Sequence, residues 1–267
     1  SIKQSAVPVG LLSAGLIGPL LTELYSWRDA LLIIATASMV LVGVLNLTRA
    51  EFDSDKDINR KFHLSDLKST ILLVLRANEL RGLAFGCFAF VGLQFTFTAY
   101  FVIYLTEIGY SLVEAGTIFS VATAVAIPGR IFWGWLSSTY IQPRVMLGLL
   151  ALSMFIANGL TSTFDSDWET WQITLVAATI SATVFSWHGV TLAEAARLAP
   201  ASMRGTATGG VLCFGQCGGL VLPLLYSLLL SLTGSYKIGF VVCALPALLV
   251  GTALLYAARR RLITKRG

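Results

Sequence analysis

Eight long apolar runs set the strongest constraint on how this chain can fold. Each covers roughly 18 to 25 residues, the length of helix that crosses about 30 Å of hydrocarbon. Backbone groups in lipid need hydrogen bonds within their own segment, and the runs lack the alternation of barrel strands. The sequence therefore predicts an all-α, polytopic membrane protein. The runs cover residues 6–24, 30–47, 82–105, 113–136, 145–164, 171–192, 206–232 and 238–258.

Composition excludes an ordinary soluble protein. Hydrophobic residues make up 56% of the 267 residues and charged residues only 12%, whereas a soluble domain carries about 25% charged residues. A chain with so few polar side chains cannot cover itself with a water-exposed surface. A soluble enzyme is therefore excluded, and the expected surroundings of the chain are a lipid bilayer.

Positive charges fall on one side of the predicted spans. If the N-terminus is cytoplasmic, the basic residues of the outside loops are only Arg28 and Lys237. The outside loops at 106–112 and 165–170 contain no Lys or Arg. Because cytoplasmic loops carry the excess of Lys and Arg, this bias predicts that both ends of the chain are cytoplasmic, in a cell (inner) membrane. The net charge of +5 then suits the anionic inner leaflet, and no nucleic-acid partner is needed to explain it.

A polar segment at residues 48–81 divides the spans into a group of two and a group of six. Its second half carries apolar residues at helical spacing, which predicts a helix at the cytoplasmic interface. These apolar residues are Leu64, Leu67, Ile71 and Leu75. The first residue is a serine and no signal peptide follows, so we expect a fragment that lacks its beginning. The expected units are two spans at 1–47, a linker at 48–81, six spans at 82–258 and a basic tail at 259–267.

Three segments carry signatures of a known family. Residues 134–144, GWLSSTYIQPR, are similar to a Gly-x-x-x-Asp-Arg-x-Gly-Arg-Arg loop. Residues 194–205, EAARLAPASMRG, are similar to a Glu-x-x-Arg, Pro, Arg-Gly pattern that precedes an eleventh helix. The Gly-Pro pair at 18–19 and the Trp-Arg pair at 27–28 are similar to a fifth helix and its turn into the sixth. Together they resemble the major facilitator superfamily, whose twelve spans form two halves joined by a cytoplasmic loop.

The resemblance implies a major facilitator-type helical bundle of which this chain holds a part. That part is the last two helices of the first half and all six of the second, so half of any substrate cavity lies outside it. The chain departs from the family pattern at Ser138, where the family has Asp, and at Pro143. The Gly-Gly of the antiporter motif is also absent after Pro19, so antiport is not predicted. The implied function is secondary transport by alternating access, in which two bundles rock about a midplane site.

Arg130 is the clearest candidate for a substrate-binding residue. It lies inside the fourth span, where an uncompensated arginine costs on the order of 2.5 to 3.5 kcal/mol. A guanidinium can bind a carboxylate through two hydrogen bonds, which favours an organic anion as the solute. With Gly134 one turn later, Arg130 also resembles the arginine on the eighth helix of monocarboxylate-type members. The alternatives are an arginine that snorkels to the inner interface or one that pairs with Glu194.

Other polar side chains within the spans are further candidates for contact with the solute. They are Gln94, Tyr100, Ser186, His188 and Gln216. All can donate or accept hydrogen bonds, and the resemblance implies that their helices line the cavity. His188 is also the candidate for a coupling proton, because imidazole exchanges a proton near neutral pH. The alternative for His188 is a neutral residue that packs inside the bundle.

Charged residues at the inner ends of the later spans are expected to form a gate. They are Arg144, Glu194, Arg197 and Arg204. Ion pairs among them would close the cytoplasmic side and rearrange as the two halves rock. A static network at the interface is the alternative.

Signatures of catalysis and metal binding are absent from the sequence. It contains no His-Glu-x-x-His, no Gly-x-Ser-x-Gly and no phosphate-binding Gly-x-x-x-x-Gly-Lys motif. Its two histidines, His63 and His188, lie far apart. We therefore expect a transporter of a small solute, not an enzyme, with no cofactor or metal ion and with a proton or ion as the coupling partner. A membrane-embedded enzyme and a transporter of a neutral or drug-like solute are the alternatives.

Overall fold

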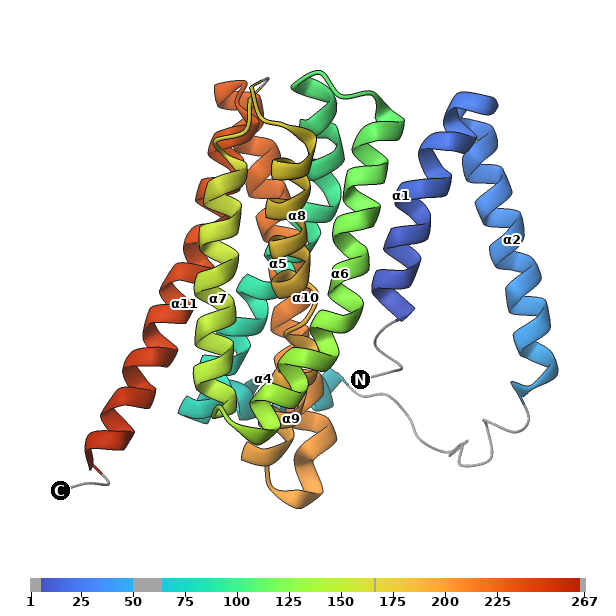
Figure 1. Ribbon diagram of the computed structural model, residues 1–267. Helices are drawn as coiled ribbons and strands as arrows, with labels where there is room; N and C mark the ends of the chain where they lie inside the picture. Colours follow the sequence, from blue (N-terminus) through green and yellow to red (C-terminus); the bar gives the residue numbers. More distant parts are fainter. Residues whose placement is uncertain (1–5, 50–63, 166, 265–267) are drawn as a thin grey trace.

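The computed structural model describes residues 6–49, 64–165 and 167–264, and every regular element in these ranges is a helix (Figure 1). Eight segments are long and apolar enough to cross a membrane, which confirms the predicted spans. The spans are α1 (Ala6–Leu24), α2 (Trp27–Leu47), α5 (Asn78–Glu107), α6 (Leu112–Thr139), α7 (Pro143–Thr161), α8 (Thr170–Val184) with α9 (His188–Leu198), α10 (Arg204–Thr233) and α11 (Tyr236–Thr264). The short elements are α4 (Leu64–Arg76) and the 3-10 turn η2 (Ala201–Met203).

Several helices, α5 and α11 among them, extend further than hydropathy predicts at the inner end, the end at which α5 begins and α9 ends. α5 begins at Asn78, before the predicted limit of 82. α11 continues to Thr264, through most of the segment predicted as a tail. Charged side chains are compatible with a helix but not with hydrocarbon. Hydropathy therefore locates the membrane portion of a helix and not the ends of the helix itself.

Side-chain caps fix where two of the spans begin at the outer end. Ser111 Oγ accepts a hydrogen bond from Glu114 N at 3.2 Å, and the Glu114 carboxylate accepts one from Ser111 N at 2.9 Å. Glu169 and Gln172 form the same reciprocal pair at the start of α8. Each pair satisfies N–H groups that the first helical turn leaves open. The local sequence thus determines the outer ends of α6 and α8.

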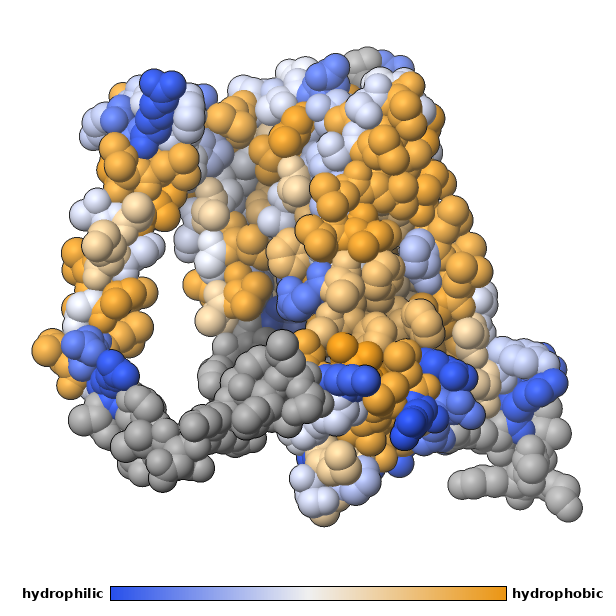
Figure 2. All heavy atoms as spheres, turned by 180° about the vertical axis from the view of Figure 1, so that it is seen from behind, coloured by the Kyte–Doolittle hydropathy of each residue, from blue (hydrophilic) through white to orange (hydrophobic). Residues whose placement is uncertain are grey.

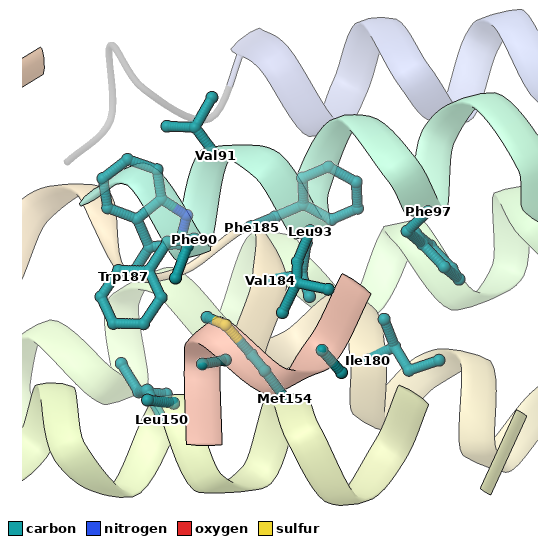
Figure 3. Packing of buried hydrophobic residues seen from close by; sticks show 14 of the residues in the cluster. Phe90, Val91, Leu93, Phe97, Leu150, Met154, Ile180, Val184, Phe185 and Trp187 are labelled. Atoms are coloured by element: carbon teal, nitrogen blue, oxygen red, sulfur yellow. The ribbon is translucent and has the colours of Figure 1, made fainter. Parts of the chain in front are cut away.

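The helices that follow α4 pack into one bundle with an aromatic and aliphatic core. α5 packs against α10 and α11, while α7 packs against α8 and α11. Figure 3 shows side chains from α5, α7 and the end of α8 meeting in this core. The rings of Phe90 and Trp187 lie 5.6 Å apart there, near Leu150 and Met154. The connection between α8 and α9, which contains Trp187, is therefore buried inside the bundle.

Glycine permits the closest approaches between helices. Gly218 of α10 lies so near α5 that an added Cβ would overlap the carbonyl group of Phe88. Gly15 of α1 and Gly116 of α6 face each other with a similarly close approach. Small residues at such contacts let the backbones of membrane helices pack directly against each other.

The helices α1 and α2 form a hairpin at one side of the bundle (Figure 1). α1 packs against α6, whereas Ala30 is the one buried residue of α2. Figure 2 shows hydrophobic side chains over the wall of the molecule and hydrophilic ones gathered toward its two ends. Such a surface is stable in contact with lipid or with other apolar helices.

The helix α4 lies across the inner end, where it contacts α10 and α5 (Figure 1). The first part of the predicted linker, residues 50–63, lies outside the described residues. Val74 is fully buried and contacts Gly210 of α10. Leu67 and Leu75 of the predicted apolar face are exposed. A helix is thus present where the spacing predicts one, and its placement at the membrane interface stays a prediction.

Candidate functional site

The sixth span is interrupted in the middle of the bundle. α8 ends at Val184 and α9 begins at His188, and the residues between them do not continue the helix. Ser186 N donates to Thr183 O at 3.2 Å, which closes a tight turn. The span predicted at 171–192 is confirmed as Thr170–Leu198, and the structure adds that the helix is broken between Val184 and His188 within it. The signal that hydropathy overlooks is a Ser-Trp-His-Gly stretch within the apolar run.

Polar side chains gather around this helix break without protein partners. Ser186 is 3% exposed and Trp187 is 0% exposed. Within the described part of the chain, neither Ser186 Oγ nor Trp187 Nε1 has a hydrogen-bond partner, and the same holds for Thr191 Oγ1. An unsatisfied buried polar group costs about 1 to 3 kcal/mol. The helix break is therefore suited to hold water or a polar ligand.

The helix α6 places Arg130 beside the helix break. Trp133 Nε1 donates to Ala182 O at 2.9 Å, which ties the inner part of α6 to the end of α8. Arg130 is 5% exposed, and its neighbour Gly129 lies so near the helix break that an added Cβ would be 3.3 Å from Ser186 Oγ. The structure therefore brings Arg130 to the helix break that precedes His188, although the two residues lie far apart in the sequence.

Helix rise gives the depth of this pair in the bundle. Arg130 lies roughly 14 Å from the inner end of α6, and His188 roughly 15 Å from the inner end of α9. Arg130 is 5% exposed, so its side chain lies inside the bundle and not on its surface. The carboxylate of Glu194, the other suggested partner of Arg130, accepts hydrogen bonds from Arg144 and Arg197.

The other predicted substrate-binding residues lie in different surroundings. Gln94 Oε1 is buried in α5 without a hydrogen-bond partner among the described residues, and Gln216 is exposed on α10. Tyr100, by contrast, donates from its hydroxyl to Pro223 O at 3.0 Å and stacks on Tyr226 with ring centroids 4.0 Å apart. Tyr100 also lies roughly 33 Å from the inner end of α5, well away from the depth of Arg130. The structure thus places Tyr100 in an aromatic cluster toward the outer end.

Three of the four predicted gating residues form ion pairs at the inner end. Glu194 Oε1 accepts a hydrogen bond from Arg144 Nε at 3.0 Å. Arg197 donates to the same carboxylate through Nε and Nη2, both at 2.7 Å. The side chain of Glu194 is 0% exposed, so these pairs are shielded from water on the carboxylate side. Arg204 makes no ion pair with a described residue.

Glu79 is a further member of this group that is not among the predicted gating residues. Its Oε2 lies 3.1 Å from Arg144 Nη2. Glu79 is in the first turn of α5, where the helix dipole favours a negative charge, but hydropathy assigned it to the linker. An acidic residue just before a span is the signal that would find it. We call Glu79, Arg144, Glu194 and Arg197 the inner ion-pair cluster, which joins α5, α7 and α9.

Comparison with known families identifies the chain. The sequence profile of the Major Facilitator Superfamily matches residues 1–209, which is 209 of the 267 residues. The chain belongs to the major facilitator superfamily. The match confirms the predicted family, and the all-helical structure with its membrane spans agrees with a major facilitator bundle. The matched part includes Arg130, the helix break and the inner ion-pair cluster.

A curated superfamily protein gives a more specific comparison. The sialic acid transporter NanX of Escherichia coli (strain K12) is 25% identical over 254 residues, which cover 92% of this chain. The chain spans 60% of the length of that relative. Superfamily membership and the eight apolar helices show a multi-pass membrane protein of the major facilitator type.

Proposed function

We propose that this chain is part of a secondary transporter that carries a small organic anion across a cell (inner) membrane by alternating access. Membership of the superfamily supports transport of a small solute. The Escherichia coli relative is named for an acid, which is consistent with an acidic solute. The orientation with both ends of the chain in the cytoplasm is part of the proposal, and it rests on the distribution of Lys and Arg.

The buried guanidinium of Arg130 is the observation that carries the proposal. Arg130 is 5% exposed within a membrane span. An arginine in this position has a high energetic cost, which marks it as a functional residue in a membrane protein. A guanidinium also matches the geometry of a carboxylate, because two parallel N–H groups can donate to its two oxygens. Arg130 would therefore attract an anionic solute and also set the orientation of its carboxylate.

The helix break supplies the second part of the proposed site. Ser186 and Thr191 place hydroxyl groups there that have no hydrogen-bond partner in the described ranges, and His188 adds its imidazole ring. Discontinuous helices near the middle of the membrane form solute sites in many transporters, because their open backbone and side-chain groups face the solute. We place the carboxylate of the solute at Arg130 and its other polar groups at the helix break.

Uptake by the full-length protein in proteoliposomes tests the role of Arg130. We expect Arg130→Ala to lower Vmax/KM for a radiolabelled carboxylate by about ten- to a hundredfold, because a hydrogen bond to a charged group contributes about 1.5 to 3 kcal/mol. Arg130→Lys should recover only part of the loss, because an ammonium group cannot form the two parallel hydrogen bonds. Arg28→Ala is the matched control, since it removes an exposed arginine at the outer end.

Two results of uptake measurements on these vesicles would change the proposal. Unchanged carboxylate uptake by Arg130→Ala would exclude the anion site and favour a neutral or drug-like solute. A proton gradient imposed on the same vesicles tests coupling, for which His188 is the candidate. Uptake that ignores this gradient in the wild-type protein would remove the coupling role of His188.

A further inference from the structure

A crevice of about 470 Å³ opens between the inner halves of α5 and α11. Figure 1 shows α11 leaning away from the bundle toward its C-terminus. The walls are mainly apolar, with Leu83 and Phe88 on α5 and Leu249 and Leu254 on α11. Leu249 is 69% exposed. A hydrocarbon chain is the chemical group that such walls accept.

Guanidinium groups lie at the floor of the crevice and beside its inner end. Arg144 of the inner ion-pair cluster lines the floor, and its side chain is 15% exposed. Arg81 donates through Nη2 to Oδ1 of Asn78, a lining residue, at 2.9 Å, so its guanidinium lies beside the crevice on α5. On α11, Arg260 follows one turn after the lining residue Ala257. The crevice thus combines an apolar body with guanidinium groups at the inner boundary of the membrane.

We propose that this crevice binds an anionic phospholipid of the inner leaflet. One acyl chain lies between α5 and α11, and the headgroup phosphate lies between Arg81 and Arg260. Basic pockets between membrane helices on the cytoplasmic side attract anionic headgroups, and a guanidinium binds a phosphate through two hydrogen bonds. The site is separate from Arg130 and from the helix break, so it does not depend on which solute the protein carries.

The crevice is connected to the inner ion-pair cluster. Glu79 and Arg144 both line it, and their side chains lie 3.1 Å apart at its floor. A phospholipid in the crevice lies against the pair that joins α5 to α7. A ligand that binds one arrangement of these helices stabilises that arrangement by mass action. The bound lipid therefore stabilises the inner end of the bundle in the arrangement described above.

Thermal unfolding of the full-length protein in detergent tests the site, with phosphatidylglycerol, phosphatidylcholine of the same acyl chains, or glycerol phosphate added in separate titrations. We expect phosphatidylglycerol to raise Tm at concentrations at least about tenfold lower than phosphatidylcholine, because both guanidinium groups contact its phosphate. Phosphatidylcholine also carries a positive charge on its headgroup, which the guanidinium groups repel. Glycerol phosphate should have little effect, because it has no acyl chain to place in the crevice.

Two variants separate the headgroup from the acyl chain. Arg81→Ala combined with Arg260→Ala should remove the preference for phosphatidylglycerol, whereas Arg28→Ala should keep it. Ala253→Trp fills the crevice from α11, and we expect it to abolish the Tm shift for both lipids while keeping the Tm measured without lipid. An equal response to both lipids, an unchanged preference in the double variant, or a full effect of glycerol phosphate would each overturn the proposal.

Discussion

Buried hydroxyl groups in the bundle are of two kinds. Thr96, Thr123 and Thr161 each donate from Oγ1 to the backbone carbonyl four residues earlier. A helix always offers that carbonyl, so these hydroxyls are satisfied wherever the helix is continuous. Ser186 and Thr191 lie at the helix break and have no such partner among the described residues. The sequence predicts the first kind from the apolar run alone, while the second kind depends on where the helix stops.

Ser186→Ala is expected to weaken solute binding without weakening the fold. The hydroxyl has no protein hydrogen bond to lose, and replacing an unsatisfied polar atom by an apolar one is neutral or stabilising. If the solute uses this hydroxyl, one hydrogen bond worth about 1 kcal/mol is lost, and KM for uptake should rise about fivefold. Uptake kinetics and Tm in detergent measure the two effects separately.

Ser120→Ala is the matched control for this prediction. Ser120 Oγ of α6 donates to Leu12 O of α1 at 2.9 Å, so its hydroxyl joins two helices. This variant should lower Tm by a few degrees and leave KM near that of the wild type. A lower Tm and an unchanged KM for Ser186→Ala would show that Ser186 is a structural residue.

At the scale of elements, close glycine contacts decide how α10 sits on α5 and α4. Gly218 contacts α5 at Phe88, and Gly210 contacts α4 at Thr70 and Val74. Gly209, the neighbour of Gly210 in the sequence, has open space where its Cβ would be. The sequence marks α10 as rich in glycine but does not distinguish these positions. These glycines differ only in the direction in which each one points, and the packing of α10 determines that direction.

Gly218→Val is expected to destabilise the bundle. The added side chain must push α10 away from the backbone of α5, and overpacking of this kind costs about 1 to 3 kcal/mol. Gly209→Ala on the same helix should instead leave stability unchanged or raise it by about 0.5 to 1 kcal/mol, because alanine restricts the unfolded chain. Thermal unfolding of the two variants in one detergent checks this, and equal Tm values would contradict the assigned contact.

At the scale of the whole molecule, the two ends of the bundle are held by different interactions. The inner ion-pair cluster joins α5, α7 and α9. Toward the outer end, Tyr104 donates to Phe164 O at 3.0 Å and Tyr226 donates to Tyr236 O at 2.9 Å, within a group of stacked aromatic rings. Removing a charge from the inner ion-pair cluster therefore weakens contacts at the inner end of the bundle and leaves the aromatic contacts at the outer end in place. This difference provides a way to test the proposed alternating access.

Glu194→Gln is expected to shift the protein toward states that are open to the cytoplasm. The neutral amide keeps the size of the side chain but loses the charge that binds Arg144 and Arg197. A cysteine placed at Gln216, which is exposed on α10, should then react several-fold faster with a membrane-impermeant maleimide added on the cytoplasmic side.

Arg204→Gln is the matched variant for this measurement, because Arg204 makes no ion pair with a described residue. Its labelling rate should equal that of the parent protein. Equal rates for Glu194→Gln and the parent would count against a gating role for the inner ion-pair cluster, and a faster rate for Arg204→Gln would restore Arg204 to the predicted gate.

The sequence by itself determined the class of fold, because a span must bury about 20 consecutive apolar residues and satisfy its own backbone. It also located Arg130 and Glu194, since a charge inside or beside an apolar run is visible without coordinates. Tertiary structure decided which charges meet, as Glu79 and Arg144 do at the floor of the crevice, because ion pairs depend on helix rotation and tilt. It also decided where the sixth span breaks beside Arg130. Hydropathy averages over many residues, whereas a break depends on the packing of a few.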